Sequence, residues 1–193
     1  MRTLDEIDIL DGVKQILRDL TIQRIDKKIF TFDSTDNKDY RRWNFWNYRK
    51  RKQYINTIFE LGGVLTGSKV LSKSYIDGKR ILERRETIKS DWDFLVTEES
   101  VYKMTSDIPF KQFNGILSHR LIENDSYGSG GQTIDLIIVK ELPMCHNVNE
   151  FSYSDPLSII NSKVNLVNQK IKGYEKHEKD LQEFYWKFNY LVK

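Results

Sequence analysis

Hydrophobic positions at the start of the chain recur with the spacing of an α-helix. The apolar residues of this stretch are Leu4, Ile7, Leu10, Val13, Ile16, Leu17 and Leu20. Because residues three and four apart share one face of a helix, this pattern predicts an amphipathic helix over the first twenty residues. A polar cluster at residues 31–39 then predicts a loop, and residues 38–61 predict a long helix.

The same helical spacing appears twice near the end of the chain. The two sets of apolar residues are Leu157, Ile160, Val164, Val167 and Ile171, and then Leu181, Phe184, Phe188 and Leu191. Each set predicts one helix with a single apolar face.

The middle of the chain has short apolar runs separated by polar turns, which is typical of strands. Residues 64–66 and 90–96 predict two strands, and residues 98–105 predict a short helix. Residues 116–123 and 133–139 predict a hairpin that turns through the glycine-rich segment Gly128-Ser129-Gly130-Gly131. We favour a plain flexible connection over a phosphate-binding role for this turn.

The order of these elements predicts a mixed α/β fold of the α+β type. A small mixed sheet would carry the acidic strands, and N-terminal and C-terminal helices would flank it. The 193 residues fit a single domain that is long enough to bury a core. We therefore predict one domain over 1–193, with N-terminal helices in 1–61, the sheet core in 62–140 and C-terminal helices in 151–193.

Three carboxylates lie on two of the predicted strands. Asp91 and Asp93 alternate with Trp92 and Phe94, so both acids would emerge on one face and both rings on the other. Asp135 lies inside an apolar run, where a buried carboxylate without a partner would be costly. Like charges held close together repel unless a cation lies between them.

If the two acidic strands are neighbours, their carboxylates form a site of oxygen ligands. Such a site suits Mg²⁺ or Mn²⁺, and two such ions promote in-line displacement at phosphorus. Phosphoryl or nucleotidyl transfer is therefore the leading chemistry.

These segments resemble the nucleotidyltransferase superfamily that includes DNA polymerase beta and kanamycin nucleotidyltransferase. The matching residues are Val64-Leu65-Thr66-Gly67-Ser68, Ser90-Asp91-Trp92-Asp93 and Ile134-Asp135-Leu136. The resemblance implies that Gly67 and Ser68 hold the triphosphate. It also implies that Asp91 and Asp93 ligate both metals, and that Asp135 completes the metal site beside the acceptor hydroxyl.

Elementary chemistry agrees with the role of the glycine and serine. A glycine lets the backbone approach phosphates closely, and backbone amides at a helix start attract anions. Gly62-Gly63 is an alternative family glycine pair. We prefer Gly67-Ser68 because residues 64–66 supply a strand before it.

The resemblance implies roles for two further residues. Lys163, on a helix after the third aspartate, would contact the nucleotide, and Asp180 on the next helix would support the site. The distance in sequence from Ser68 to Asp91 is roughly double the usual family spacing. Residues 75–87 are therefore predicted to be an insertion or a longer helix and loop.

The expected function is metal-dependent nucleotidyl transfer. An NMP would pass from an NTP, with ATP as the expected triphosphate, to a hydroxyl on an RNA end, a protein or a small molecule, and pyrophosphate would leave. The alternative is an inactive module of the same fold that binds a nucleotide or RNA, or that inhibits a partner protein.

Residues 40–52 combine six basic and five aromatic side chains with no acid. Basic residues neutralise phosphates and aromatic rings stack on unpaired bases, so this segment is a candidate surface for RNA or a single-stranded acceptor. The competing interpretation, which we favour, buries the rings in the core and leaves the cations in solvent.

Composition indicates a cytoplasmic protein without a membrane segment. No apolar run approaches the ~20 residues that span a bilayer, and the first residues lack the layout of a secretory signal. The single cysteine, Cys145, excludes an internal disulfide, and with His146 it matches no structural zinc spacing. The net charge of +3 gives little general affinity for nucleic acid.

Overall fold

The computed structural model describes residues 4–25, 45–83, 91–107, 110–112, 118–121 and 134–192. The helices in these ranges are α1 (Leu4–Asp19), α3 (Phe45–Glu60), α4 (Ser68–Leu71), α5 (Glu98–Asp107), α6 (Pro156–Asn168), α7 (Tyr174–Phe188) and the 3₁₀ helix η2 (Asn189–Leu191). The first strands are β1 (Arg24–Ile25), β2 (Val64–Thr66), β3 (Ser74–Ile76), β4 (Lys79–Arg80) and β5 (Trp92–Val96). The later strands are β6 (Phe110–Gln112), β7 (Ser118–Leu121), β8 (Ile134–Ile138), β9 (Cys145–Val148) and β10 (Phe151–Ser154). The mixed α/β class is confirmed.

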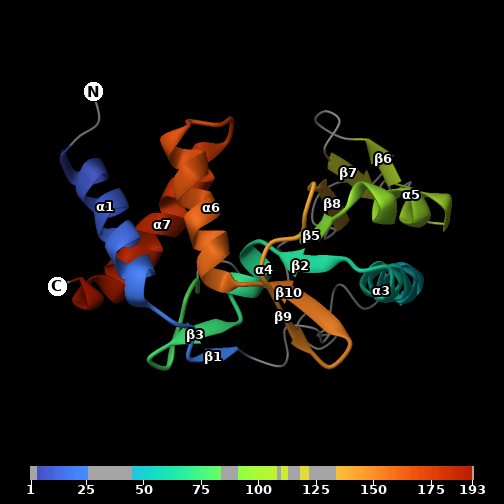
Figure 1. The fold of residues 1–193 in the computed structure, drawn as a ribbon, viewed down its shortest axis with the longest axis horizontal. Coiled ribbons are helices and arrows are strands. Elements are labelled where there is room, and N and C mark those ends of the chain that lie inside the picture. The colour runs from blue at the N-terminus through green and yellow to red at the C-terminus, as the bar shows by residue number, and fades with distance from the viewer. Residues whose placement is uncertain are drawn as a thin grey trace. The chain divides into compact units, whose positions relative to one another are not determined.

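The chain forms two compact units, each assembled from separate stretches of sequence (Figure 1). The helical unit comprises Met1–Asp26, Leu71–Arg84 and Asp155–Lys193, and the sheet unit comprises Lys27–Val70 and Arg85–Ser154. The two units interleave along the chain.

The sheet unit is built on a seven-stranded sheet with the order β6-β7-β8-β5-β2-β10-β9. β5 is parallel to β8 and antiparallel to β2, and β10 is parallel to β2. Burial alternates along β5, where Trp92, Phe94 and Val96 are buried. Phe59 of α3 packs edge-on against Phe94 and Phe151, with ring centroids 5.1 and 4.9 Å apart. These aromatic contacts hold α3 on the apolar side of the sheet.

The helical unit packs α1, α6 and α7 against one another beside a three-stranded sheet, β1-β3-β4 (Figure 1). Its core takes the apolar faces predicted from the helical spacing, with Leu10, Val13, Ile160, Val164, Leu181 and Phe184 all buried. The last residue of two predicted helices was wrong. Ile171 lies beyond α6 and is exposed, and Leu191 lies in η2 rather than in α7.

A tight hairpin joins β3 to β4, so of the two alternatives for residues 75–87 the longer helix is excluded over the described residues 75–83. Asp77 and Gly78 form the two-residue turn and both have positive φ, 47° and 74°. Asp-Gly is the sequence typical of this turn, because a type I′ geometry needs positive φ at both positions. The signal was therefore present in the sequence.

A second hairpin, β9–β10, extends the sheet beyond the predicted core of 62–140. Asn149 takes a positive φ of 55° at its turn, and Tyr153 of β10 pairs with Leu65 of β2. The sheet thereby gains two strands that hydrophobic spacing alone did not reveal.

Several predictions made from the sequence lie outside the described residues. These are the loop at 31–39, the helix start at 38–44 and the glycine-rich turn at 128–131. The hairpin on either side of that turn is confirmed, because β7 and β8 pair antiparallel. Among the described helices, none has the length and apolar character needed to cross a membrane.

The carboxylate of Asp77 connects the hairpin turn to two other segments of the helical unit. It accepts hydrogen bonds from the Tyr190 hydroxyl at 2.8 Å and from the Gln23 amide at 2.6 Å. These two bonds, and then the charge of Lys79, lower the pKa of Asp77 below its usual value. A lowered pKa stabilises the fold above the ordinary pKa, and this contribution disappears as the pH falls through the folded-state pKa.

We expect Tyr190→Phe to raise the pKa of Asp77 toward its ordinary value, because the hydrogen bond that lowers it most is removed. Carboxyl NMR titration of Asp77 measures the change. Tyr102→Phe, at an exposed position on α5, is the control and should leave the Asp77 pKa unchanged. An unshifted pKa in Tyr190→Phe would contradict the assignment.

Candidate functional site

The register of the sheet brings two of the three predicted carboxylates together. Asp93 on β5 is the direct partner of Asp135 on the parallel strand β8. Neighbouring strands lie about 4.8 Å apart in the hydrogen-bonding direction, and partner residues share a face of the sheet. Asp135 is buried and Asp93 is half-buried. The two acidic strands are therefore neighbours in the sheet.

Asp91 lies immediately before β5 and is half-buried. It is two residues from Asp93, the spacing that keeps side chains on one side of an extended segment. Within the described ranges, no group of three or more His, Cys, Asp or Glu side chains is arranged to hold a metal ion. The three-aspartate metal site thus stays a prediction, with two of its members paired by the sheet.

Gly67 follows β2 directly against the carboxylate of Asp93. It has a φ of 76°, and a Cβ at this position would collide with Oδ2 of Asp93. Both the backbone conformation and the lack of space therefore require glycine here. Ser68 comes next, begins α4 and is buried. Gly67 and Ser68 thus form the turn from strand β2 into helix α4.

The alternative glycine pair has a different role in the chain. Gly62 has a φ of 87°, and the amides of Gly62 and Gly63 donate to the carbonyls of Phe59 and Ile58 at 2.9 and 2.8 Å. This is the hydrogen-bonding pattern of a helix C-terminal cap. Gly62-Gly63 ends α3, whereas Gly67 is the glycine beside Asp93.

A polar row crosses the sheet through the paired carboxylates. Thr66 of β2 is the partner of Asp93, and Arg120 of β7 stands in register with Asp135. The adjacent row consists of Leu65, Phe94 and Leu136, which are mutual partners and fully buried. Because successive rows point to opposite faces, the apolar row fixes the side on which the acids emerge.

Two residues of this region were missed by sequence reasoning. Thr66 could be placed beside Asp93 only once the strand register was known. Lys69 is buried, and its ammonium lies 4.7 Å from the centre of the Trp92 ring. Trp92 thus holds a cation by a cation–π contact next to the acidic strand. The signal for this contact in the sequence is Trp92, whose ring can both pack in the core and bind a cation.

Lys163 and Asp180, the two helical residues that the resemblance singled out, contact each other in the helical unit. Nζ of Lys163 lies 3.0 Å from Oδ2 of Asp180 and 3.2 Å from Nδ1 of His177. The Lys163 side chain is 6% exposed and that of Asp180 is 0% exposed. A buried carboxylate therefore neutralises the lysine, and the role of Lys163 in nucleotide binding stays a prediction.

Comparison with protein-family models, with curated proteins and with solved structures gives no significant match for this chain.

We expect Gly67→Ala to destabilise the protein more than Gly62→Ala does. Both substitutions place alanine at positive φ, which costs about 1–2 kcal/mol. At Gly67 the new methyl also meets Asp93, whereas at Gly62 the nearest atom is 4.0 Å away. The collision should add at least about 1 kcal/mol, as overpacking does. Urea unfolding measures both variants, and equal losses would contradict the close approach.

We expect Lys163→Met to destabilise the helical unit by about 3–5 kcal/mol, because it leaves Asp180 buried without its cation. The double variant Lys163→Met/Asp180→Leu should recover much of this loss, because it also removes the stranded charge. Thermal unfolding followed by circular dichroism measures the three proteins. A double variant no more stable than the single variant would show that the pair is not the main interaction of Asp180.

Proposed function

We propose that this protein is a metal-dependent nucleotidyltransferase that moves an NMP from an NTP, with ATP as the expected substrate, to an acceptor hydroxyl. The observation that carries the proposal is the pairing of Asp93 with Asp135 on adjacent parallel strands. The close approach of Gly67 to Asp93 adds support, because these residues come from two of the segments that carry the resemblance.

The pairing favours chemistry that uses a cation. Two carboxylates on one face repel each other and repel a phosphate, and a metal ion bound between them relieves both repulsions. Asp93 and Asp135, with Asp91 beside them in sequence, offer only oxygen ligands, which suit Mg²⁺ or Mn²⁺. When bound, such ions would polarise the phosphoryl oxygens and lower the pKa of the attacking hydroxyl.

The remaining steps are assigned to residues of the chain. The acceptor oxygen forms a bond to the α-phosphorus, and the bond from that phosphorus to the bridging oxygen of the β-phosphate breaks. Pyrophosphate leaves with the electron pair of the broken bond, and the carboxylate of Asp135 accepts the hydroxyl proton. Gly67 lets the backbone pass close to Asp93, and Ser68 at the start of α4 donates hydrogen bonds to the triphosphate.

The same observations weigh against a module that only binds a nucleotide or RNA. A site selected to bind phosphate alone gains from cations and amides, and paired acids would weaken it. The acceptor can be an RNA end, a protein or a small molecule, because specificity in such enzymes resides outside the metal site.

The test is incubation of the purified protein with each α-³²P-labelled NTP, Mg²⁺ or Mn²⁺, and separate RNA, protein and small-molecule fractions of a cell lysate. We expect label to appear in one fraction. Asp93→Asn should lower the yield about 10²-fold or more, because it removes a charge needed for metal binding. Glu141→Gln, an exposed control in the same unit, should leave transfer unchanged.

Binding of ATP and Mn²⁺ is measured on the same proteins by calorimetry. Nucleotide binding without transfer to any fraction would favour the binding module. Transfer that survives Asp93→Asn would remove Asp93 from the reaction.

A further inference from the structure

The three-stranded sheet of the helical unit carries a row of two arginines and a tyrosine on one face. Arg24 of β1 pairs with Tyr75 of β3, and Tyr75 pairs with Arg80 of β4. Partners on neighbouring strands share a face, so these three side chains, called here the arginine row, cross the sheet in line. Ser74 and Ile76, on either side of Tyr75, are fully buried, which places the arginine row on the opposite, outer face.

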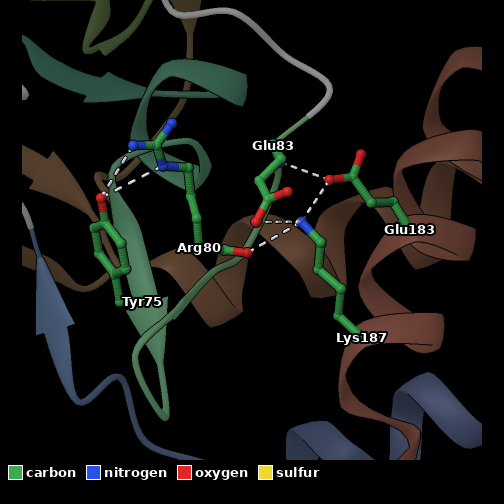
Figure 2. Close-up of polar contacts among 5 residues, drawn as sticks. All are labelled: Tyr75, Arg80, Glu83, Glu183 and Lys187. Carbon is green, nitrogen blue, oxygen red and sulfur yellow. Dashed lines mark hydrogen bonds and ion pairs between the residues drawn. The ribbon is translucent and has the colours of Figure 1, made fainter.

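Tyr75 orients both guanidinium groups of the arginine row. The guanidinium carbon of Arg24 lies 4.9 Å from the centre of the ring, and that of Arg80 lies 5.7 Å from it. Nη2 and Nε of Arg80 also donate to the Tyr75 hydroxyl at 3.2 and 3.4 Å (Figure 2). Two cations are thus held at fixed positions by one aromatic side chain.

The carboxylates near the arginine row are bound by other groups. Nζ of Lys187 lies 2.7 Å from Glu183 and 3.7 Å from Glu83, and it also donates to the backbone carbonyl of Arg80. Figure 2 shows the guanidinium of Arg80 turned toward Tyr75 and away from this group. An arginine that served only the fold would be expected to pair with such an acid.

The carboxylate in the hairpin turn is also bound by groups other than the arginines. Asp77 accepts hydrogen bonds from Tyr190 and Gln23. In the part of the chain that the structure describes, neither guanidinium of the arginine row forms an ion pair with a carboxylate. The exposed Lys79, whose ammonium lies 4.7 Å from the Tyr190 ring centre, adds a third cation to the three-stranded sheet. Three cations, Arg24, Lys79 and Arg80, thus outnumber the carboxylate of Asp77, and these strands carry a net positive charge.

We propose that the arginine row binds the phosphodiester backbone of single-stranded nucleic acid. A guanidinium presents a planar set of N–H donors that matches phosphate oxygens. Among the described residues, Arg24 donates no hydrogen bond to the protein. The two arginines lie on strands separated by Tyr75, so they contact different phosphates. The outer faces of the guanidinium planes also offer surfaces on which unpaired bases stack.

This inference does not depend on nucleotidyl transfer. The arginine row belongs to the helical unit, whereas Asp93 and Asp135 belong to the sheet unit. Its test measures equilibrium binding without a nucleoside triphosphate. Failure of one proposal therefore leaves the other standing.

The experiment is fluorescence anisotropy with a 5′-labelled single-stranded RNA of mixed sequence, titrated with the full chain at several salt concentrations. We expect the wild type to bind and Arg24→Gln/Arg80→Gln to bind about tenfold more weakly or worse. Loss of two phosphate contacts should also reduce the slope of log K against log salt by about 1.4. Lys14→Gln/Lys103→Gln removes the same charge from two exposed helical positions and should bind like the wild type.

Two further proteins make the result decisive. Arg24→Gln alone, at an exposed position, should weaken binding and reduce the slope by about 0.7 with an unchanged circular dichroism spectrum. Tyr75→Phe keeps both charges but frees Arg80 from its hydroxyl partner, so it should weaken binding with little change in slope.

The proposal is overturned if the wild type does not bind the RNA or if the arginine variants bind like the wild type. An equal loss in the lysine control would show a general charge effect. Duplex RNA that competes as well as the single strand would refute single-strand recognition, and displacement by ATP at matched phosphate concentration would assign the arginine row to a nucleotide.

Discussion

The hydrogen-bonded register of β5 is the constraint on which the sheet unit depends. β5 lies between β2 and β8, so one strand sets Thr66, Asp93 and Asp135 in line and also aligns Leu65, Phe94 and Leu136. A slip of one residue would exchange the two rows and drive carboxylates into the core. Burial of the apolar row is the physical reason that the acids emerge together. The candidate chemistry is thus a consequence of packing on the other face of the sheet.

Charge is handled differently in the two units. In the sheet unit, Asp93 and Asp135 are brought side by side, and Trp92 holds the ammonium of Lys69 nearby. In the helical unit, opposite charges meet, as in the buried contact of Lys163 with Asp180 and the group around Lys187. Opposite charges in contact stabilise a fold, whereas like charges held close together raise each other's pKa and favour binding of a cation. The proposed catalytic site therefore lies in the sheet unit.

Local sequence patterns predicted the long helices and the acidic strands, whereas the short strands β1 and β6 and the hairpins β3–β4 and β9–β10 were not predicted. Helical spacing located α1, α6 and α7, and the alternation of Asp91 to Val96 located β5, because these signals lie within a single element. The placement of Thr66 beside Asp93 depends on how two strands align, which no local pattern states. The contact of Lys163 with Asp180 likewise depends on how two helices pack. The Asp77-Gly78 turn differs from these contacts, because its Asp-Gly dipeptide is a local sequence signal for a hairpin.

The interleaving of the two units has a consequence for synthesis on the ribosome. α1 is made well before its packing partners α6 and α7, because more than one hundred residues separate them in sequence. The apolar face formed by Leu10, Val13 and Ile16 is therefore covered only after those later helices have been made. Exposed apolar faces on nascent chains attract chaperones and promote aggregation. Synthesis of α6 and α7 is thus the step that ends the exposure of this face.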